Sequence, residues 1–379
     1  MNTRLEAFIR GKRFPGAFVG LLLLITAYVT IKVTQATEQM WGVHPRFTVF
    51  LCLMAISALV AYSQQHLRHN SVYRVCACIT SYYLCYMVYF LMILAVGDVI
   101  CRVTHPGAGW QIYAEQLVGI AGLSALALVV GGTVHARKLR VKPYTLHLGD
   151  TGAQYHMVLL SDLHLGTLVQ SGHIRKMVRE VNALRPDMVV ITGDLFDGKS
   201  TKECPDLERV TAALRQLRTK DGVYAVLGNH DPDVSDPDLT RFLKDSSIKL
   251  LYNSTAEFPL FTMAGRMGLA ATNGEERTPL TRLLSHCDRS KPVVVLDHDP
   301  QGIREAETVQ ADLVLCGHTH RGQFFPMNLF TKLSLEKGFY YGYTRLGKTQ
   351  AVISAGTGFH QMPIRIGSDS EIVDLHLHI

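Results

Sequence analysis

The chain has 379 residues, enough for two or three domains, and residues 1–150 carry 13 Lys and Arg against 5 Asp and Glu, a net charge of +8. Residues 151–379 carry 25 against 27, a net charge of −2, so the second half lacks the basic excess of a nucleic-acid surface and no nucleic-acid partner is expected. The eight cysteines include no Cys-x-x-Cys pair, which favours reduced, buried thiols over zinc fingers or a disulfide framework.

The first half contains four apolar runs, at Ala17–Ile31, Phe47–Tyr62, Val75–Val96 and Leu117–Val134. Each approaches the ~20 residues that cross a hydrocarbon core of ~30 Å. Buried helices of a soluble protein rarely follow one another four times with such short loops, so residues 1–134 are predicted to form a four-helix transmembrane bundle. The alternative for the first run is a signal peptide, but no Ala-x-Ala-like cleavage site follows it and three more runs do.

The charges around these runs predict their orientation. Ten Lys and Arg residues lie before the first run, between the second and third, and after the fourth, against Lys32, Arg46 and Arg102 on the other side. Because basic residues concentrate on the cytoplasmic side, we expect a multi-pass protein of the inner (cytoplasmic) membrane, with its N-terminus and its second half in the cytoplasm. Residues 135–150 are expected to form a basic linker that anionic lipids attract.

From residue 151 onward, short apolar runs alternate with amphipathic segments, as in an α/β fold. Buried strands are predicted at Met157–Leu160, Met188–Thr192, Val223–Leu227, Val293–Leu296 and Leu313–Leu315, and a helix at His173–Leu184 that ends before Pro186. In such a fold the loops at the carboxyl ends of the strands collect the functional side chains.

Five of these runs are each followed by a cluster of Asp, Asn and His. The clusters are Asp162-Leu163-His164, Gly193-Asp194-Leu195-Phe196-Asp197, Gly228-Asn229-His230-Asp231, Asp297-His298-Asp299 and Gly317-His318-Thr319-His320. Each alone is more typical of an ordinary turn or a surface histidine than of a metal site. Together, and in this order, they indicate a metal site, because imidazole and carboxylate are common metal ligands and glycine leaves room for an ion.

These clusters resemble the complete motif series of the calcineurin-like metallophosphoesterases, across Leu159 to Gln323. The segments Ser354–Gly358 and Met362–Arg365 resemble the membrane-attached, multi-pass bacterial branch of that family. Two positions depart from the pattern, Arg321, where that branch more often has glycine, and Pro232. The resemblance implies that residues 151–379 form an αββα metallophosphoesterase sandwich.

The resemblance also implies two divalent metal ions. Asp162, His164, Asp194 and His320 would hold the first, and Asp194, Asn229, His298 and His318 the second, with Asp194 as the bridge. This mixture of ligands suits manganese, which we favour, or iron or zinc, better than calcium. Asp197 and Asp231 are expected to orient ligand or catalytic imidazoles.

Two cations ~3.5–4 Å apart lower the pKa of a shared water and neutralise phosphoryl charge. The leaving alkoxide then needs a proton, and His230 is where the family keeps that general acid. Arg321 is expected either to bind phosphate through its planar guanidinium or to be a solvent-exposed loop charge. The aromatic segment from Phe324 to Tyr343 has three explanations: a hydrophobic lid, a contact with acyl chains or the bilayer, and ordinary packing on the sheet.

The function expected first is a membrane-bound dimetal phosphohydrolase that cleaves phosphodiester or pyrophosphate bonds of a lipid or lipid-linked substrate at the cytoplasmic face. Its expected partners are membrane lipids and the phosphate-ester substrate, and no protein partner is inferred. One alternative is a phosphomonoesterase or nuclease that acts on soluble substrates. A second is a non-catalytic metal-binding scaffold, which is disfavoured because such proteins usually lose ligands and none is missing here.

Overall fold

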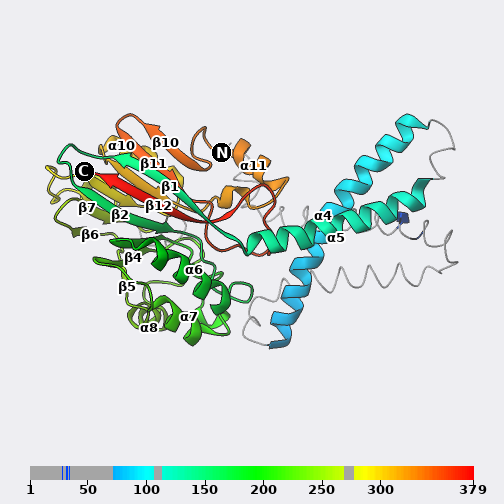
Figure 1. Ribbon diagram of the computed structural model, residues 1–379, viewed down its shortest axis with the longest axis horizontal. Helices are drawn as coiled ribbons and strands as arrows, with labels where there is room; N and C mark the ends of the chain where they lie inside the picture. The colour runs from blue at the N-terminus through cyan, green and yellow to red at the C-terminus, as the bar shows by residue number, and fades with distance from the viewer. Residues whose placement is uncertain (1–27, 29–30, 33, 35–70, 106–112, 269–276) are drawn as a thin grey trace. The chain divides into compact units, whose positions relative to one another are not determined.

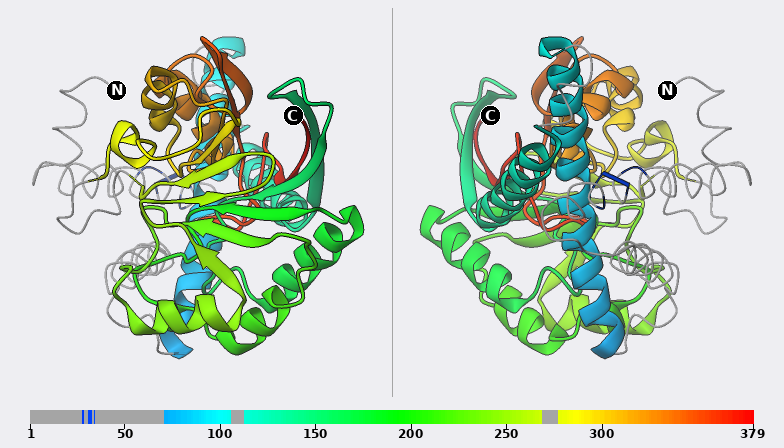
Figure 2. Two further views of the ribbon diagram at one scale, coloured as in Figure 1. Left: turned by 90° about the vertical axis from the view of Figure 1, so that its left-hand side faces the viewer. Right: turned by 90° about the vertical axis from the view of Figure 1, so that its right-hand side faces the viewer.

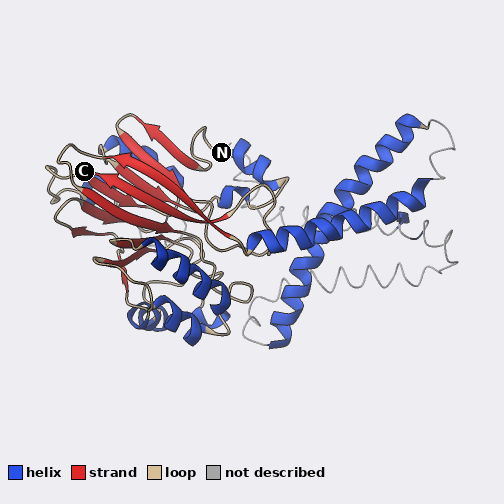
Figure 3. Cartoon of the chain, viewed as in Figure 1, coloured by secondary structure: helices blue, strands red, loops and turns tan. Residues whose placement is uncertain are grey.

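The computed structural model describes residues 28, 31–32, 34, 71–105, 113–268 and 277–379 (Figure 1). The chain divides into two compact units, Met1–Gly132 and Thr133–Ile379. Helix is the main structure described in the first unit, whereas strands and helices alternate in the second (Figure 3).

Two long helices account for most of the described part of the first unit. They are α4 (Ser71–Thr104) and α5 (Ala114–Ala136), and by length and composition both can cross a membrane, over Arg74–Thr104 and Gln116–Ala136. They coincide with the third and fourth predicted spans. The first two predicted spans fall almost entirely outside the described residues, so the structure provides two candidate spans and does not establish the predicted four-helix bundle.

The second unit is built on two six-stranded sheets. The first has the order β1-β12-β2-β3-β4-β5 and the second β10-β11-β9-β8-β7-β6. The strands of the first sheet are β1 (Leu139–His147), β2 (Gln154–Leu160), β3 (Met188–Thr192), β4 (Gly222–Val226), β5 (Ile248–Leu250) and β12 (Ser370–His378). Those of the second are β6 (Ser254–Glu257), β7 (Thr262–Gly265), β8 (Val293–Leu296), β9 (Leu313–Cys316), β10 (Gly342–Leu346) and β11 (Thr349–Ile353).

Strands β2 to β5 run parallel in sequence order, and so do β7, β8 and β9. Parallel neighbours need crossover connections, which α6 (Ser171–Leu184), α7 (Leu207–Leu214) and α8 (Pro237–Asp245) supply in the first sheet. Helices α9 (Leu280–Leu283) and α10 (Ile303–Thr308) do so in the second sheet. The carboxyl ends of β2, β3 and β4 therefore lie along one edge of the first sheet, and those of β8 and β9 along one edge of the second.

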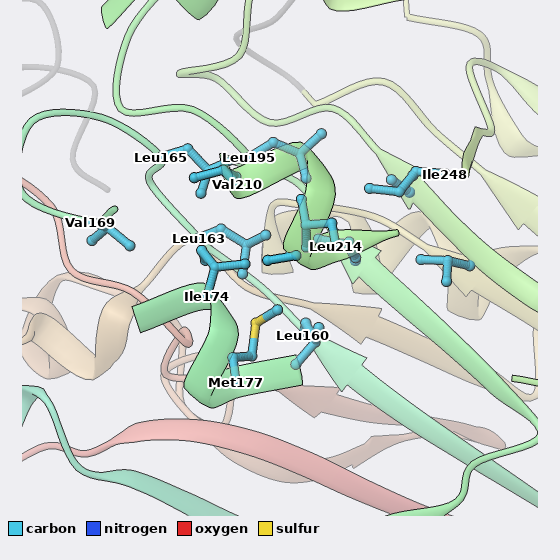
Figure 4. Close-up of a cluster of buried hydrophobic side chains, with 14 of the residues drawn as sticks. Leu160, Leu163, Leu165, Val169, Ile174, Met177, Leu195, Val210, Leu214 and Ile248 are labelled. Carbon is cyan, nitrogen blue, oxygen red and sulfur yellow. The ribbon is translucent and has the colours of Figure 1, made fainter. Parts of the chain in front are cut away.

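Three buried apolar layers hold the second unit together. One lies between the first sheet and helices α6 to α8, and Figure 4 shows part of it, with Ile174 and Met177 of α6 beside Leu160 of β2. The central layer combines residues of both sheets, such as Met157 and Val294, and the third lies under α9 and α10. The order of layers is therefore helix, sheet, sheet, helix, as predicted, and the helices lie outside the paired sheets in Figure 2.

Helix α6 illustrates why the predicted elements formed. Its buried positions Ile174, Met177, Val178 and Val181 follow the helical period, and the helix ends at Arg185 in a left-handed conformation (φ 56°) just before proline. Strands β3 and β8 have the predicted bounds, and the other predicted strands differ from them by at most three residues at either end.

The predicted basic linker is largely a strand. Within residues 135–150, α5 ends at Ala136 and β1 covers Leu139–His147, pairing in parallel with β12 at the edge of the first sheet. The basic and polar side chains hid this strand from a search for apolar runs, because an edge strand keeps much of its surface in water. The second unit accordingly begins before residue 151.

Candidate metal centre

Each of the seven predicted ligands follows the carboxyl end of a strand. Four follow strands of the first sheet and three follow strands of the second. Those after strands of the first sheet are Asp162 and His164 after β2, Asp194 after β3 and Asn229 after β4. Those after strands of the second sheet are His298 after β8 and His318 and His320 after β9. The structure brings all seven side chains into one site, which explains how residues 158 positions apart in sequence can act together.

Five of the ligand residues have backbone conformations that side chains normally avoid. Their φ angles are 51° at Asp162, 47° at His164, 51° at Asp194, 71° at His318 and 49° at His320. Each such conformation costs a non-glycine residue about 1–3 kcal/mol and persists only where the surroundings enforce it. Their concentration in the strand-end turns is typical of a functional site.

The first group of donors consists of Asp162, His164 and His320. The Nε2 atoms of the two imidazoles are 2.9 Å apart, and His320 Nε2 lies 3.4 Å from Asp162 Oδ1. The Asp162 carboxylate also accepts hydrogen bonds from the His318 backbone N at 3.1 Å, which links the β2 turn to the β9 turn. One oxygen and two nitrogens thus converge on one point.

The second group consists of Asp194, His298 and His318, with Asn229 beside them. His298 Nε2 lies 3.2 Å from Asp194 Oδ2, 3.2 Å from His318 Nδ1 and 3.1 Å from Asn229 Oδ1. The other ring nitrogen of His298, Nδ1, lies 2.8 Å from the carbonyl oxygen of Thr192, which fixes the orientation of the ring.

Asp194 lies between the two groups. Its Oδ2 is 3.7 Å from His164 Nε2 of the first group and 3.2 Å from His298 Nε2 of the second. Burial alone would raise the pKa of Asp194, but the His298 and His164 imidazoles hold it well below its usual value. Burial would also lower the pKa of His298, yet the Asp194 carboxylate raises it to about 10. Asp194 is therefore placed to bridge two cations.

The donor set fits two divalent cations. Two pairs of imidazole nitrogens face each other, at 2.9 Å in one pair and 3.2 Å in the other. A hydrogen bond within such a pair would use the lone pair of only one nitrogen, whereas a cation can accept the lone pairs of both. The Nδ1 atom of His320 is buried and has no hydrogen-bond partner. Such convergence of nitrogen and carboxylate oxygen is the ligand chemistry of borderline divalent metals.

The two carboxylates predicted to orient imidazoles have different roles. Asp197 Oδ1 lies 3.3 Å from His164 Nδ1, without the geometry of a hydrogen bond, and 2.7 Å from His360 Nδ1, so its orienting role at His164 stays a prediction. The oxygens of Asp231 accept hydrogen bonds from the backbone N of Gly228 and of Phe196, at 2.8 and 2.9 Å. Asp231 thus fixes the backbone of two ligand turns, whereas we expected it to orient an imidazole.

His230 lies beside this centre. Its backbone N donates to Asp194 Oδ1 at 2.8 Å, and its ring centre is 5.3 Å from that of His164. Burial lowers the pKa of His230 to about 4, although the Asp194 carboxylate opposes this. The imidazole is therefore neutral at pH 7 in the free site, and its role as general acid stays a prediction.

His360 belongs to the site and was not predicted. Its ring centre lies 4.3 Å from that of His230 and 4.7 Å from that of His164, and its Nδ1 contacts Asp197. It follows no strand directly, so a search for polar residues at strand ends passes over it. The signal that could have found it is its place within the glycine-rich segment from residue 354 to 365.

Arg321 has an aromatic neighbour. Its guanidinium carbon lies 4.5 Å from the centre of the Tyr341 ring, a cation–π contact, and its carbonyl accepts a hydrogen bond from the Tyr340 hydroxyl at 2.8 Å. The residue is partly buried, so it is not a freely solvated loop charge. Phosphate binding by Arg321 stays a prediction.

Arg365 is buried and donates hydrogen bonds to the backbone of turns beside the predicted ligands. Its guanidinium donates to the carbonyls of Gly358 at 2.6 Å, Gly356 at 3.3 Å and His320 at 3.1 Å. The backbone N of Gly358 in turn donates to the Asp162 carbonyl at 3.0 Å. Arg365 thus connects turns that carry ligands from both sheets.

Comparison with known proteins agrees with this geometry. The calcineurin-like phosphoesterase family matches residues 145–322. An uncharacterized metallophosphoesterase of Helicobacter pylori is 32% identical over 241 residues, covering 63% of this chain and 64% of the relative. The chain therefore spans slightly less than two thirds of that relative's length.

Two further relatives differ in how much of their own sequence lies outside the matched region. The Bos taurus "Transmembrane protein with metallophosphoesterase domain" is 34% identical over 239 residues, covering 58% of this chain and 52% of that protein. An uncharacterized metallophosphoesterase of Aquifex aeolicus is 29% identical over 258 residues, covering 65% of this chain and 96% of that protein. Residues 145–322 of this chain are thus similar to the calcineurin-like phosphoesterases, and both donor groups of the metal centre lie within the matched region.

Proposed function

We propose that the chain is a metal-dependent hydrolase of phosphodiester or pyrophosphate bonds in a lipid or lipid-linked substrate. The observation that carries the hydrolase assignment is the pair of donor groups joined by Asp194. Bound divalent cations would supply a water of lowered pKa and neutralise phosphoryl charge. We propose manganese, with iron and zinc as alternatives, because mixed imidazole, carboxylate and amide ligands suit these ions better than calcium.

The chain's own residues supply the rest of the chemistry. Asp162 and Asp194 concentrate negative charge in a buried site, and Asp197 places a third carboxylate 3.3 Å from the ring of His164. His230 lies on the same turn as Asn229 and is the candidate donor of a proton to the leaving oxygen. A phosphate anion beside it would raise its pKa from about 4, because nearby negative charge favours the imidazolium form.

An exposed apolar helix beside the centre supports a lipid substrate. Helix α11 (Met327–Ser334) begins five residues after the turn at His320–Gly322, and it has no buried residue. Five large apolar side chains on and next to it are exposed, namely Phe325, Met327, Leu329, Phe330 and Leu333. Phe330 is 57% and Leu333 74% exposed. Large apolar side chains exposed together on one short helix are typical of a surface for a membrane, a ligand or a partner.

Membrane association is the second support. Helices α4 and α5 can each span a bilayer by length and composition, and the Bos taurus relative is named as a transmembrane protein. A hydrolase tethered to the membrane gains access to lipid-linked substrates, whereas a soluble nucleotide needs no tether. We further propose that the domain works at the cytoplasmic face of the inner membrane, because basic residues flank the expected inner ends of the spans.

The Aquifex aeolicus relative favours the alternative of soluble substrates. The matched region makes up 96% of that protein, so the domain occurs with little added sequence. A phosphomonoesterase or nuclease acting on soluble substrates is therefore the second candidate.

The test is turnover by the full-length protein, purified in lipid nanodiscs and reconstituted with Mn²⁺. The substrates are a lipid phosphodiester, a lipid-linked pyrophosphate, a single-stranded oligonucleotide and an aryl phosphate. We expect the Leu333→Glu variant to lose at least tenfold in turnover of the lipid substrate while its turnover of aryl phosphate is unchanged. Tyr343→Glu, at a 45% exposed residue on β10, is the matched control and should affect neither.

The outcomes separate the candidates. Equal loss on both substrates in Leu333→Glu would show that α11 only supports the fold. Efficient cleavage of aryl phosphate or oligonucleotide without cleavage of any lipid substrate would favour the soluble alternative. Two bound metal ions without any turnover would favour the non-catalytic scaffold.

A further inference from the structure

A separate cluster of two histidines and an aspartate lies on the first sheet, away from the metal centre. His156 lies near the start of β2, whereas the ligands of the centre follow the carboxyl end of that strand. Strand β12 is antiparallel to β2 and places His376 directly opposite His156, with Asp374 two residues earlier on the same face. Met157 and Leu375 belong to the core between the sheets, so these three polar side chains project from the opposite face.

The three side chains converge. His156 Nε2 lies 2.5 Å from Asp374 Oδ1, and His376 Nε2 lies 3.3 Å from Asp374 Oδ2. The two rings are stacked with centres 4.6 Å apart, as expected of residues directly opposite on neighbouring strands. One donor atom from each residue lies within 4.8 Å of the other two.

The site is accessible from one side. The Asp374 side chain is 10% exposed, that of His156 21% and that of His376 48%. A hollow of about 210 Å³ adjoins the group and is also lined by Gln154, Asp187 and His378. This leaves space for water or a further ligand beside the three donors.

We propose that His156, Asp374 and His376 bind a divalent cation of the zinc, cobalt, nickel or copper class. Two imidazoles and a carboxylate are the ligands that such ions take, whereas calcium and magnesium prefer oxygen ligands alone. Tetrahedral zinc with bonds of about 2.0–2.1 Å has its donors about 3.3 Å apart, which is the spacing between His376 and Asp374. His156 has to withdraw from Asp374 by less than about 1 Å to reach the same spacing.

Charge favours occupation of the site. In the described part of the chain, no lysine or arginine pairs with the Asp374 carboxylate, and both of its oxygens face imidazole nitrogens. A bound cation would neutralise the Asp374 carboxylate and take both imidazoles as neutral ligands. It also links β2 to β12, so binding stabilises the folded sheet by mass action.

The experiment counts metal ions bound to the tag-free, full-length protein. Protein stripped by chelator is dialysed against Zn²⁺, and bound zinc is measured by mass spectrometry, with thermal unfolding followed by circular dichroism. We expect His376→Ala to bind one equivalent fewer than the wild type and to lose part of the rise in unfolding temperature that zinc produces. His378→Ala is the matched control, since it removes the next histidine on the same face of β12. Its zinc count should equal that of the wild type.

Further variants test whether the zinc equivalent lost in His376→Ala belongs to this cluster. Asp194→Asn, which affects only the metal centre, should keep the equivalent that His376→Ala loses. Cu²⁺ added as one further equivalent should give an electron paramagnetic resonance spectrum with nitrogen hyperfine structure that disappears in His156→Ala. Equal zinc counts in wild type and His376→Ala, with unchanged unfolding temperatures in the absence of metal, would overturn the proposal. So would loss of the same equivalent in His378→Ala.

Discussion

Arg365 provides the sharpest test of how the metal centre is held in place. It is 1% exposed and donates to three backbone carbonyls, those of His320, Gly356 and Gly358. We predict that Arg365→Met, which keeps an unbranched side chain but removes the guanidinium, destabilises the second unit and weakens metal binding. The first effect comes from the loss of three buried hydrogen bonds, and the second from release of the His320 turn.

The magnitude follows from two opposing contributions. A hydrogen bond from a charged group contributes about 1.5–3 kcal/mol, so loss of the three guanidinium bonds costs about 4.5–9 kcal/mol. Against this, burial lowers the pKa of Arg365 from 12.5 to about 10, although Glu371 opposes the shift, and a change of that size corresponds to about 3 kcal/mol. Removal of the buried charge recovers that amount. The difference gives an expected net loss of stability of about 1.5–6 kcal/mol.

Two measurements check this prediction on the full-length protein in detergent. Urea unfolding followed by circular dichroism gives the loss of stability, and competition with a fluorescent chelator gives the Mn²⁺ affinity. Support residues of metal sites typically contribute 10–100-fold in affinity, and we expect a loss in this range. Arg345→Met is the control, because Arg345 is exposed and donates to the Gly347 carbonyl on a surface hairpin. Wild-type stability together with wild-type Mn²⁺ affinity in Arg365→Met would refute the reasoning.

Three further substitutions probe the ligands themselves. Asp194→Asn should lose both bound metals and all turnover, because one substitution weakens both donor groups; retention of two Mn²⁺ ions by mass spectrometry would contradict the bridging role. His230→Ala should keep its metals and lose about 10²–10⁴-fold in turnover of esters with poor leaving groups but little with good ones, and equal losses across a series of aryl phosphates would exclude it as the acid. Gly317→Ala should lose about 1–3 kcal/mol of stability and part of its metal affinity, because the added Cβ would overlap Ser161 and the Asp162 carboxylate. Its control is Gly172→Ala, where an added Cβ meets nothing within 4 Å, and equal effects at both glycines in thermal unfolding would disprove the steric argument.

Sequence reasoning succeeded where a buried strand leads directly into a polar turn. Residues such as Asp162 and His298 directly follow apolar strands, and parallel strands end at the same edge of a sheet, so their convergence could be expected before any coordinates. The left-handed turns that aim these side chains could not be expected, because Asp and His adopt φ near 50° only where contacts distant in sequence enforce it.

The elements that were not predicted have more mixed sequences. Strand β1 carries basic side chains, and β12 (Ser370–His378) alternates apolar residues with Asp and His, so neither is a continuous apolar run. Both are defined by their pairing, in which β12 lies between β1 and β2. Helix α11 was anticipated only as an aromatic segment, since sequence alone does not tell whether Phe330 packs inward or faces solvent.

The position of β12 means that the working unit extends beyond the family match, which ends at residue 322. The backbone N of Thr357 donates to the Ser161 carbonyl at 2.8 Å, and that of Glu371 donates to the Gly356 carbonyl at 3.0 Å. These bonds attach the segment before β12 to the first ligand turn. Because β12 also pairs with β2 along its length, loss of the C-terminal strand would expose the edge of β2 and release Asp162 together with the segment that carries His360. The last 57 residues are therefore as necessary to the metal centre as the turns that carry its ligands.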